Sequence, residues 1–219
     1  MTRARGHGRR LGLAALACAR DTTNVIRFGT GAPRFAERIW IDPNRVKRVS
    51  HDPGLRRPQS AKVIGGDWDK TAETLGKWDK YNACISHWTH GVSWEDTGII
   101  AALTEQIHTT GPVDGLKQPK DVVERYRKLD TIFCSIAQRG QLASVREHGE
   151  HLFRAWGDIL IHVGRGPEAI LGRGGHHRLA IAHCLGLEVA PAQIGCVHPS
   201  ALASWTDIVV RSNNRPATA

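Results

Sequence analysis

The segment from Ile159 to His198 constrains the fold of this chain more than any other part of the sequence. Two short apolar runs flank Gly164-Arg165-Gly166-Pro167, which has the composition of a tight turn. The pattern predicts a hairpin, a glycine-rich loop, a helix stopped by Gly186 and a closing strand, over residues 159–163 and 169–171, 172–175, 176–185 and 189–197. This order predicts an α/β (α+β) domain built around a small mixed sheet.

The loop Gly172-Arg173-Gly174-Gly175 leads directly into the helix that begins His176-His177-Arg178. Glycines allow backbone amides to converge, and a helix N-terminus attracts anions. The imidazoles and the guanidinium add hydrogen-bond donors at the same end. We therefore predict a phosphate site made by Arg173, Gly174, Gly175, His176, His177 and Arg178. The alternative is a plain tight turn with Arg178 on the surface.

The same stretch resembles the ParB/sulfiredoxin superfamily. The resemblance lies in the helix end Ser135-Ile136-Ala137-Gln138-Arg139-Gly140, the hairpin, the run G-G-H-H-R-L-A-I-A-H-C-L-G-L and the strand and turn of Glu37 to Asn44. It covers residues 37–48 and 121–198. It implies a nucleotide-binding domain of the ParB N-terminal type, with a helical insertion at about residues 50–119.

The resemblance implies that ATP or another nucleoside di- or triphosphate binds at this loop. By position, Gly174, Gly175, His177 and Arg178 would hold the phosphates. His176 stands where sulfiredoxins have their catalytic cysteine, so repair of sulfinic acids is not expected. His176, His177 and Arg178 are instead the candidate catalytic residues of an NTPase or of a phosphotransferase that acts on a small molecule.

Asp67 and Asp69 lie in the turn Gly65-Gly66-Asp67-Trp68-Asp69, which together with the glycine-rich loop resembles a set of uncharacterised ParB-like proteins. Carboxylate oxygens are the ligands that Mg²⁺ prefers, so these two residues are candidate Mg²⁺ ligands beside the phosphates. The alternative is structural: Asp67 forms the turn, Asp69 caps the next helix and Trp68 packs in the core.

Positive charge is concentrated at the start of the chain. Residues 1–60 hold 13 Lys and Arg against 4 Asp and Glu, whereas residues 61–219 hold 17 of each. Residues 1–36 are therefore expected to form a basic N-terminal arm that contains a helix. This arm could contact nucleic acid, or a membrane surface through residues 9–20. Arginines before an apolar stretch also outline a signal peptide, but the stretch is short and alanine-rich. We expect a cytoplasmic protein without a transmembrane segment, with peripheral attachment to a membrane as the alternative.

Residues 37–200 are expected to form the domain and residues 201–219 a C-terminal tail. Within the insertion, helical spacing links Leu75 to Trp88, Ser93 is the expected N-cap of a second helix, and Asp121 of a third that ends at Gly140. The five cysteines form no C-x-x-C pair and are expected to be free thiols. The pairs His87 and His90, and His148 and His151, are weak zinc candidates because neither has a third ligand nearby.

Two functions follow from these observations. The first is a nucleotide-binding protein that acts as an NTPase or phosphotransferase. The second is a DNA-associated or regulatory ParB-like module that uses the arginine-rich arm and has no catalysis. The neutral charge of residues 61–219 favours the first.

Overall fold

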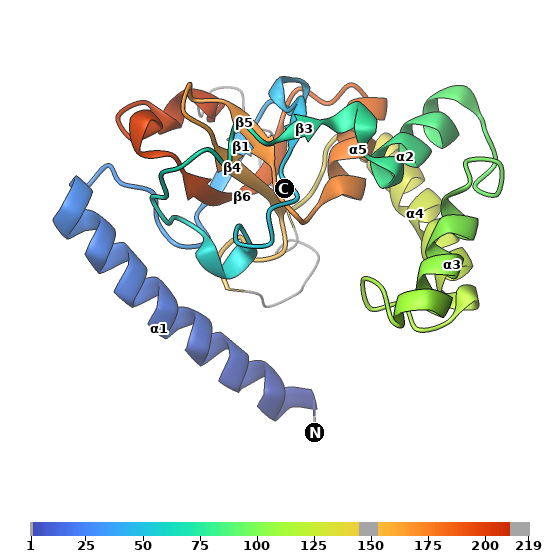
Figure 1. The fold of residues 1–219 in the computed structure, drawn as a ribbon, viewed down its shortest axis with the longest axis horizontal. Helices are drawn as coiled ribbons and strands as arrows, with labels where there is room; N and C mark the ends of the chain where they lie inside the picture. The colour runs from blue at the N-terminus through green and yellow to red at the C-terminus, as the bar shows by residue number, and fades with distance from the viewer. Residues whose placement is uncertain (1, 145–152, 211–219) are drawn as a thin grey trace.

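The computed structural model describes residues 2–144 and 153–210 (Figure 1). The helices are α1 (Thr2–Phe28), α2 (Asp79–His90), α3 (Ile99–Thr110), α4 (Pro119–Arg139) and α5 (His176–Cys184). The strands are β1 (Arg38–Ile41), β2 (Arg48–Val49), β3 (Glu73–Thr74), β4 (Ile159–Val163), β5 (Ala169–Leu171) and β6 (Ala190–Val197).

The strands of the described residues form one mixed sheet in the order β1-β6-β4-β5-β2-β3. β4 and β5 are the antiparallel hairpin, and β6 returns parallel to β4. Every residue of β4 and β6 is buried, as apolar strands in the middle of a covered sheet must be. The expected mixed sheet and its α+β class are therefore confirmed.

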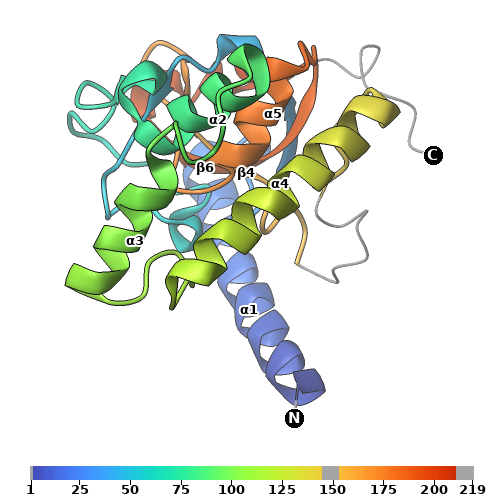
Figure 2. The same ribbon diagram turned by 90° about the vertical axis from the view of Figure 1, so that its right-hand side faces the viewer.

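α5 lies between the sheet and a helical group made by α2, α3 and α4 (Figures 1 and 2). Leu179 and Ile181 of α5 pack in the core of the sheet, whereas Ala180 packs with the helical group. The first turn of α5 thus opens at the boundary between the two layers. α4 begins with a capping box in which Asp121 occupies the third helical position, and it ends at Gly140, whose φ of 66° is left-handed.

Two helices begin later than the sequence predicts. The helix expected to follow Asp69 begins at Asp79, because the Arg48 guanidinium binds the carbonyl oxygens of Asp69 and Ala72 at 2.7 and 2.8 Å. Those carbonyls are consequently held away from helical hydrogen bonds. Ser93 accepts from the Asp96 amide at 3.0 Å, but this caps an isolated turn, and α3 begins only after Gly98, which has φ 76°.

The basic arm is one long helix, α1, and its two halves differ. The second half packs on the body: Ala17 is 2% exposed beside Phe35 and Trp156, and the Asn24 amide group binds the carbonyl oxygens of Pro33 and Ala61. The first half extends away from the rest of the molecule in both views (Figures 1 and 2). No helix in the described part of the chain is long and apolar enough to cross a membrane.

The C-terminal boundary differs from the expected one at residue 201. Ala201, Trp205 and Ile208 are buried in the core of the sheet, and Val209 forms a bridge to Ile41 of β1. Residues 201–210 therefore belong to the folded body. Residues 211–219, the rest of the expected tail, lie outside the described residues. All five cysteines are free, two of them (Cys18 and Cys134) exposed.

Candidate functional site

The loop before α5 is close to the sheet. Gly175 has φ 88°, and a Cβ atom there would come within 2.6 Å of the Ile159 Cα atom, so only glycine fits. Gly172 donates its amide to the Leu160 carbonyl, and Gly174 donates to the Gly172 carbonyl, both at 2.7 Å. These two amides are consequently used inside the protein and do not face a ligand.

The amides that remain open belong to the first turn of α5. Its first helical hydrogen bond is donated by Leu179 to the Gly175 carbonyl, and no side chain caps the helix. The amides of Gly175, His176 and His177 find no acceptor among residues 2–144 and 153–210. Such a turn carries partial positive charge and unused donors, which suits an oxyanion.

Arg178 is engaged away from those amides. Its guanidinium donates to the Asp158 carboxylate at 2.9 Å and to the Ala143 carbonyl. Asp158 is fully buried, and its second carboxylate oxygen lies 3.6 Å from the Arg38 guanidinium. Arg178 is therefore one partner of a buried ion pair with Asp158. This differs from its expected role as a phosphate ligand. Arg173 is exposed.

Arg57 lies on the other side of the loop. It donates to the Asp158 carbonyl at 2.6 Å and to the Gln193 side chain at 2.7 Å. A Cβ atom on Gly174 would lie 2.6 Å from its guanidinium, so a side chain at this position would displace Arg57. Burial is the main cause that lowers the pKa of Arg57 to about 10; the charge of Asp158 opposes this shift and the charge of Arg178 adds to it.

His176 and His177 form a pair at the start of α5. Their Nε2 atoms are 3.1 Å apart and their ring centroids 3.9 Å apart. One of the two nitrogens must donate and the other accept, so the pair shares one proton when both rings are neutral. Burial lowers the pKa of His177 to about 4 and that of His176 well below its ordinary value. Both imidazoles are therefore neutral at pH 7.

The helical group surrounds this pair with aromatic rings and cations. The Trp78 ring is 4.6 Å from His176 and the Tyr126 ring 5.8 Å from His177. Lys80 and Arg125 are close enough that their charges lower the pKa values of both histidines. Asp114 partly balances them, since its carboxylate pairs with Lys80 and its carbonyl accepts from Arg125 at 2.9 Å. The surroundings favour a negatively charged ligand over a cation.

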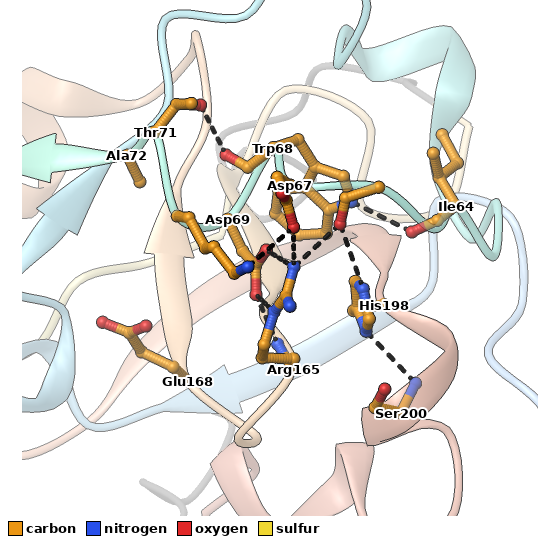
Figure 3. A network of polar contacts seen from close by, with 12 residues as sticks. Ile64, Asp67, Trp68, Asp69, Thr71, Ala72, Arg165, Glu168, His198 and Ser200 are labelled. Atoms are coloured by element: carbon orange, nitrogen blue, oxygen red, sulfur yellow. Dashed lines mark hydrogen bonds and ion pairs between the residues drawn. The ribbon is translucent and has the colours of Figure 1, made fainter.

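Asp67 and Asp69 lie elsewhere, against the turn between β4 and β5 (Figure 3). Arg165 donates to both Asp69 oxygens at 2.8 Å and to Asp67 at 2.8 Å, and Lys70 adds a contact to Asp67 at 3.1 Å. Hydrogen bonds from Arg165 hold the pKa of Asp69 well below its usual range. The two carboxylates are thus already neutralised. The structural alternative holds in two of its three parts. Trp68 is buried and the Asp67 carbonyl accepts from the Lys70 amide at 3.0 Å in a turn, but Asp69 caps no helix.

The weaker histidine candidates are also accounted for by packing. His87 contacts the Asp130 carboxylate at 3.1 Å, and this carboxylate also accepts from the indoles of Trp88 and Trp94. The tryptophans therefore belong to a helical core. His148 and His151 lie outside the described residues. In the part of the chain that the structure describes, no three histidine, cysteine, aspartate or glutamate side chains gather as a metal site would require.

Sequence reasoning did not find the residues that surround the predicted loop. Lys80 and Arg125 come from α2 and α4, and Arg57 and Asp158 from loops at the sheet edge. They are distant in sequence from the loop and form no local motif with it. The helical group, which folds back over α5, places Lys80 and Arg125 there, whereas Arg57 comes from the turn Arg57–Gln59 and Asp158 from the residue before β4.

Comparison with known proteins gives no family for this chain: no family model, no curated protein and no solved structure matches it.

Proposed function

We propose that the protein binds the phosphates of a nucleoside di- or triphosphate at the first turn of α5, as an NTPase or a phosphotransferase. One observation carries this proposal: the amides of Gly175, His176 and His177 are unused at a helix N-terminus beside two cations, Lys80 and Arg125. Amides and cations together are the usual means of holding a polyphosphate. The resemblance to the ParB/sulfiredoxin superfamily supports the same ligand.

The histidine pair supplies the chemistry in this proposal. Because the two rings share one proton, one ring keeps an N–H and the other a lone pair for the ligand. The N–H can donate to a phosphate oxygen, and the lone pair can take the proton of an attacking water or hydroxyl group. Arg178 acts at a distance, by fixing α5 through Asp158.

Magnesium enters this proposal with the nucleotide. Polyphosphates hold Mg²⁺ through their own oxygens, and the protein need add only one or two carboxylates. Asp67 and Asp69 would have to release Arg165 before they could bind the ion. We therefore place Mg²⁺ on the nucleotide and give these carboxylates a structural role.

The test is a thermal-shift panel of ATP, ADP, CTP and GTP with and without Mg²⁺. A nucleotide at 100 times its dissociation constant should stabilise the fold by about 2.7 kcal/mol. His177→Phe, which keeps a ring of similar size, should lose this stabilisation, whereas His108→Ala on the exposed face of α3 should keep it. No stabilisation of the wild-type protein by any of the four nucleotides at millimolar concentration contradicts the proposal.

The second candidate is a DNA-associated module, and the shape of α1 is the observation that favours it. The first half of α1, which carries Arg3, Arg5, Arg9 and Arg10, extends away from the body (Figure 2). A projecting basic helix can contact a phosphate backbone with little sequence preference. Changing these four arginines to glutamine should then abolish salt-dependent retention on DNA. If the nucleotide stabilisation also disappears, the arm and the α5 site are not independent.

A further inference from the structure

A second positively charged site lies at the edge of the sheet, at the start of β1. A cavity of about 330 Å³ opens there, lined by Arg34, Glu37, Arg38 and Arg154. A volume near the lower end of the usual range for ligand sites suits a small metabolite. The lining brings three guanidinium groups together from two segments that are more than 100 residues apart in sequence.

Two of these arginines are held in place by the fold. Arg154 donates to the Phe35 carbonyl at 2.7 Å and pairs with Asp21 of α1 at 2.8 Å. Arg38 lies on β1, where its Nε atom is buried without a hydrogen bond and is 3.6 Å from Asp158. The cavity therefore has a rigid wall, in which Arg154 is fixed by its two contacts and Arg38 by its ion pair with Asp158.

Arg34 completes the cavity from the turn before β1. Its backbone amide donates to the Glu37 carboxylate at 2.8 Å, and its carbonyl accepts from the Glu37 amide at 3.0 Å. Its guanidinium, by contrast, forms no hydrogen bond or ion pair with the described part of the chain. A reciprocal turn thus fixes the backbone and leaves the charged group available to a ligand.

The described side chains that line the cavity carry unequal charge. The lining holds three positive groups and one negative group. Asp21 serves Arg154, but Asp158 is shared by Arg38 and Arg178, and Arg57 binds its carbonyl. Among the described residues, the lining itself thus carries two more positive than negative groups, which an anion with two negative charges would balance.

We propose that this cavity binds a small organic dianion whose oxygens accept hydrogen bonds from Arg34, Arg38 and Arg154. Guanidinium groups match phosphate and carboxylate oxygens equally well in pairs of parallel hydrogen bonds, so the ligand is a phosphomonoester or a dicarboxylate. The site is separate from the first turn of α5 and does not depend on the proposed nucleotide function.

The test is calorimetric titration of the full chain with glycerol 3-phosphate and with succinate, using glycerol as the neutral control. Arg34→Gln should weaken binding about tenfold or more, because one charge-assisted contact is lost. Arg127→Gln, an exposed arginine on α4, should leave binding unchanged. Whichever of the two anions binds identifies the class of the ligand.

Glu37→Gln gives an independent test in the opposite direction. It removes the one negative charge from the lining and should tighten binding of the dianion. His177→Phe, at the α5 site, should leave binding at this cavity unchanged. The proposal is overturned if neither anion binds at millimolar concentration, if Arg34→Gln and Arg127→Gln bind alike, or if only His177→Phe weakens binding.

Discussion

At the residue scale, Asp158 is the buried carboxylate that pairs with the guanidinium groups of Arg178 and Arg38. Its carboxylate is fully buried between Arg178 and Arg38, and its carbonyl binds Arg57. Three guanidinium groups from distant parts of the chain thereby converge on one residue at the start of β4. Removing one partner from a buried ion pair lowers the free energy of unfolding strongly, because the charge left behind has neither water nor an opposite charge beside it.

Asp158→Asn should lower the free energy of unfolding by about 3–5 kcal/mol, the usual result of removing one partner from a buried ion pair. Glu168→Gln is the matched control. Glu168 pairs with Arg48 at 2.9 Å but is 38% exposed, so this change should cost about 1 kcal/mol or less. Urea denaturation measures both. Equal losses for the two variants would show that Asp158 is not the centre of this network.

The pKa of His177 gives a prediction for the dependence of stability on pH. The folded-state pKa is about 4, below the ordinary value of 6.5, so the unfolded chain binds a proton more readily. Stability from this group is complete above pH 6.5 and is lost as the pH falls to about 4, by up to about 3 kcal/mol. His177→Phe should flatten this part of the profile in phosphate-free buffer.

The control for this profile is His108→Ala, which changes an exposed histidine and should keep the slope of the wild-type protein. Phosphate should reduce the loss of stability of the wild-type protein at acid pH, since a bound anion favours the protonated imidazole. Identical slopes for wild-type protein and His177→Phe would mean that the ring is not buried as the structure has it.

At the residue scale, the sequence predicted less of the site than of the fold. His176 and His177 are at the first turn of α5, as expected, but Arg178 is turned toward Asp158. A guanidinium on a long side chain can reach many acceptors, and the local sequence does not show which acceptor is buried nearby. The same holds for Asp67 and Asp69, whose partner Arg165 is almost 100 residues away.

At the scale of elements, α5 and its loop fit only one arrangement. The loop must turn sharply over β4, and Gly175 takes a left-handed conformation where its backbone passes the Ile159 Cα atom. The open amides of α5 exist because this turn leaves no room for a capping side chain. The glycine-rich sequence is therefore explained by packing as well as by any ligand.

Gly175→Ala should consequently destabilise the fold by about 1–3 kcal/mol from backbone strain alone, with the close contact to Ile159 adding to this. Gly166→Ala is the control, because a Cβ atom there meets nothing within 4 Å. Thermal unfolding of both variants gives the comparison. A Gly175→Ala protein as stable as the Gly166→Ala protein would contradict the described geometry of the loop.

Most regular elements could be predicted where a local pattern determines them. The hairpin, α4 with its Gly140 stop, and the closing strand follow from apolar runs and terminators. The start of α2 could not be predicted from a local pattern, because Arg48 binds the carbonyl oxygens of Asp69 and Ala72 and so keeps them from helical hydrogen bonds. Hydrogen bonds between distant residues override local propensity at such points.

At the scale of the whole molecule, the two halves of α1 differ: the second half packs on the body and the first half carries the basic side chains. Its second half closes a small apolar cluster with Phe35 and Trp156, so its apolar face is largely used by the protein itself. Three large apolar side chains of α1 remain exposed: Leu11 at 72%, Val25 at 39% and Ile26 at 79%. The arrangement favours a docked helix with a free basic end over a helix that lies on a membrane.

Ala17→Asp should therefore undock α1, since a charge at a position 2% exposed has no partner in the cluster. Leu11→Asp should leave the helix docked. Hydrogen exchange of the α1 amides measures undocking without requiring that the whole protein unfold. Equal protection of α1 in both variants would contradict the packing of its second half on the body.

The central claim is that the open first turn of α5 receives phosphate oxygens, and amide NMR tests it most directly. Titration of the ¹⁵N-labelled protein with a non-hydrolysable ATP analogue should shift the amide resonances of Gly175, His176 and His177 most strongly. His177→Phe should bind the analogue more weakly. Saturation with the analogue that leaves these three amides unmoved, with or without Mg²⁺, would contradict the account.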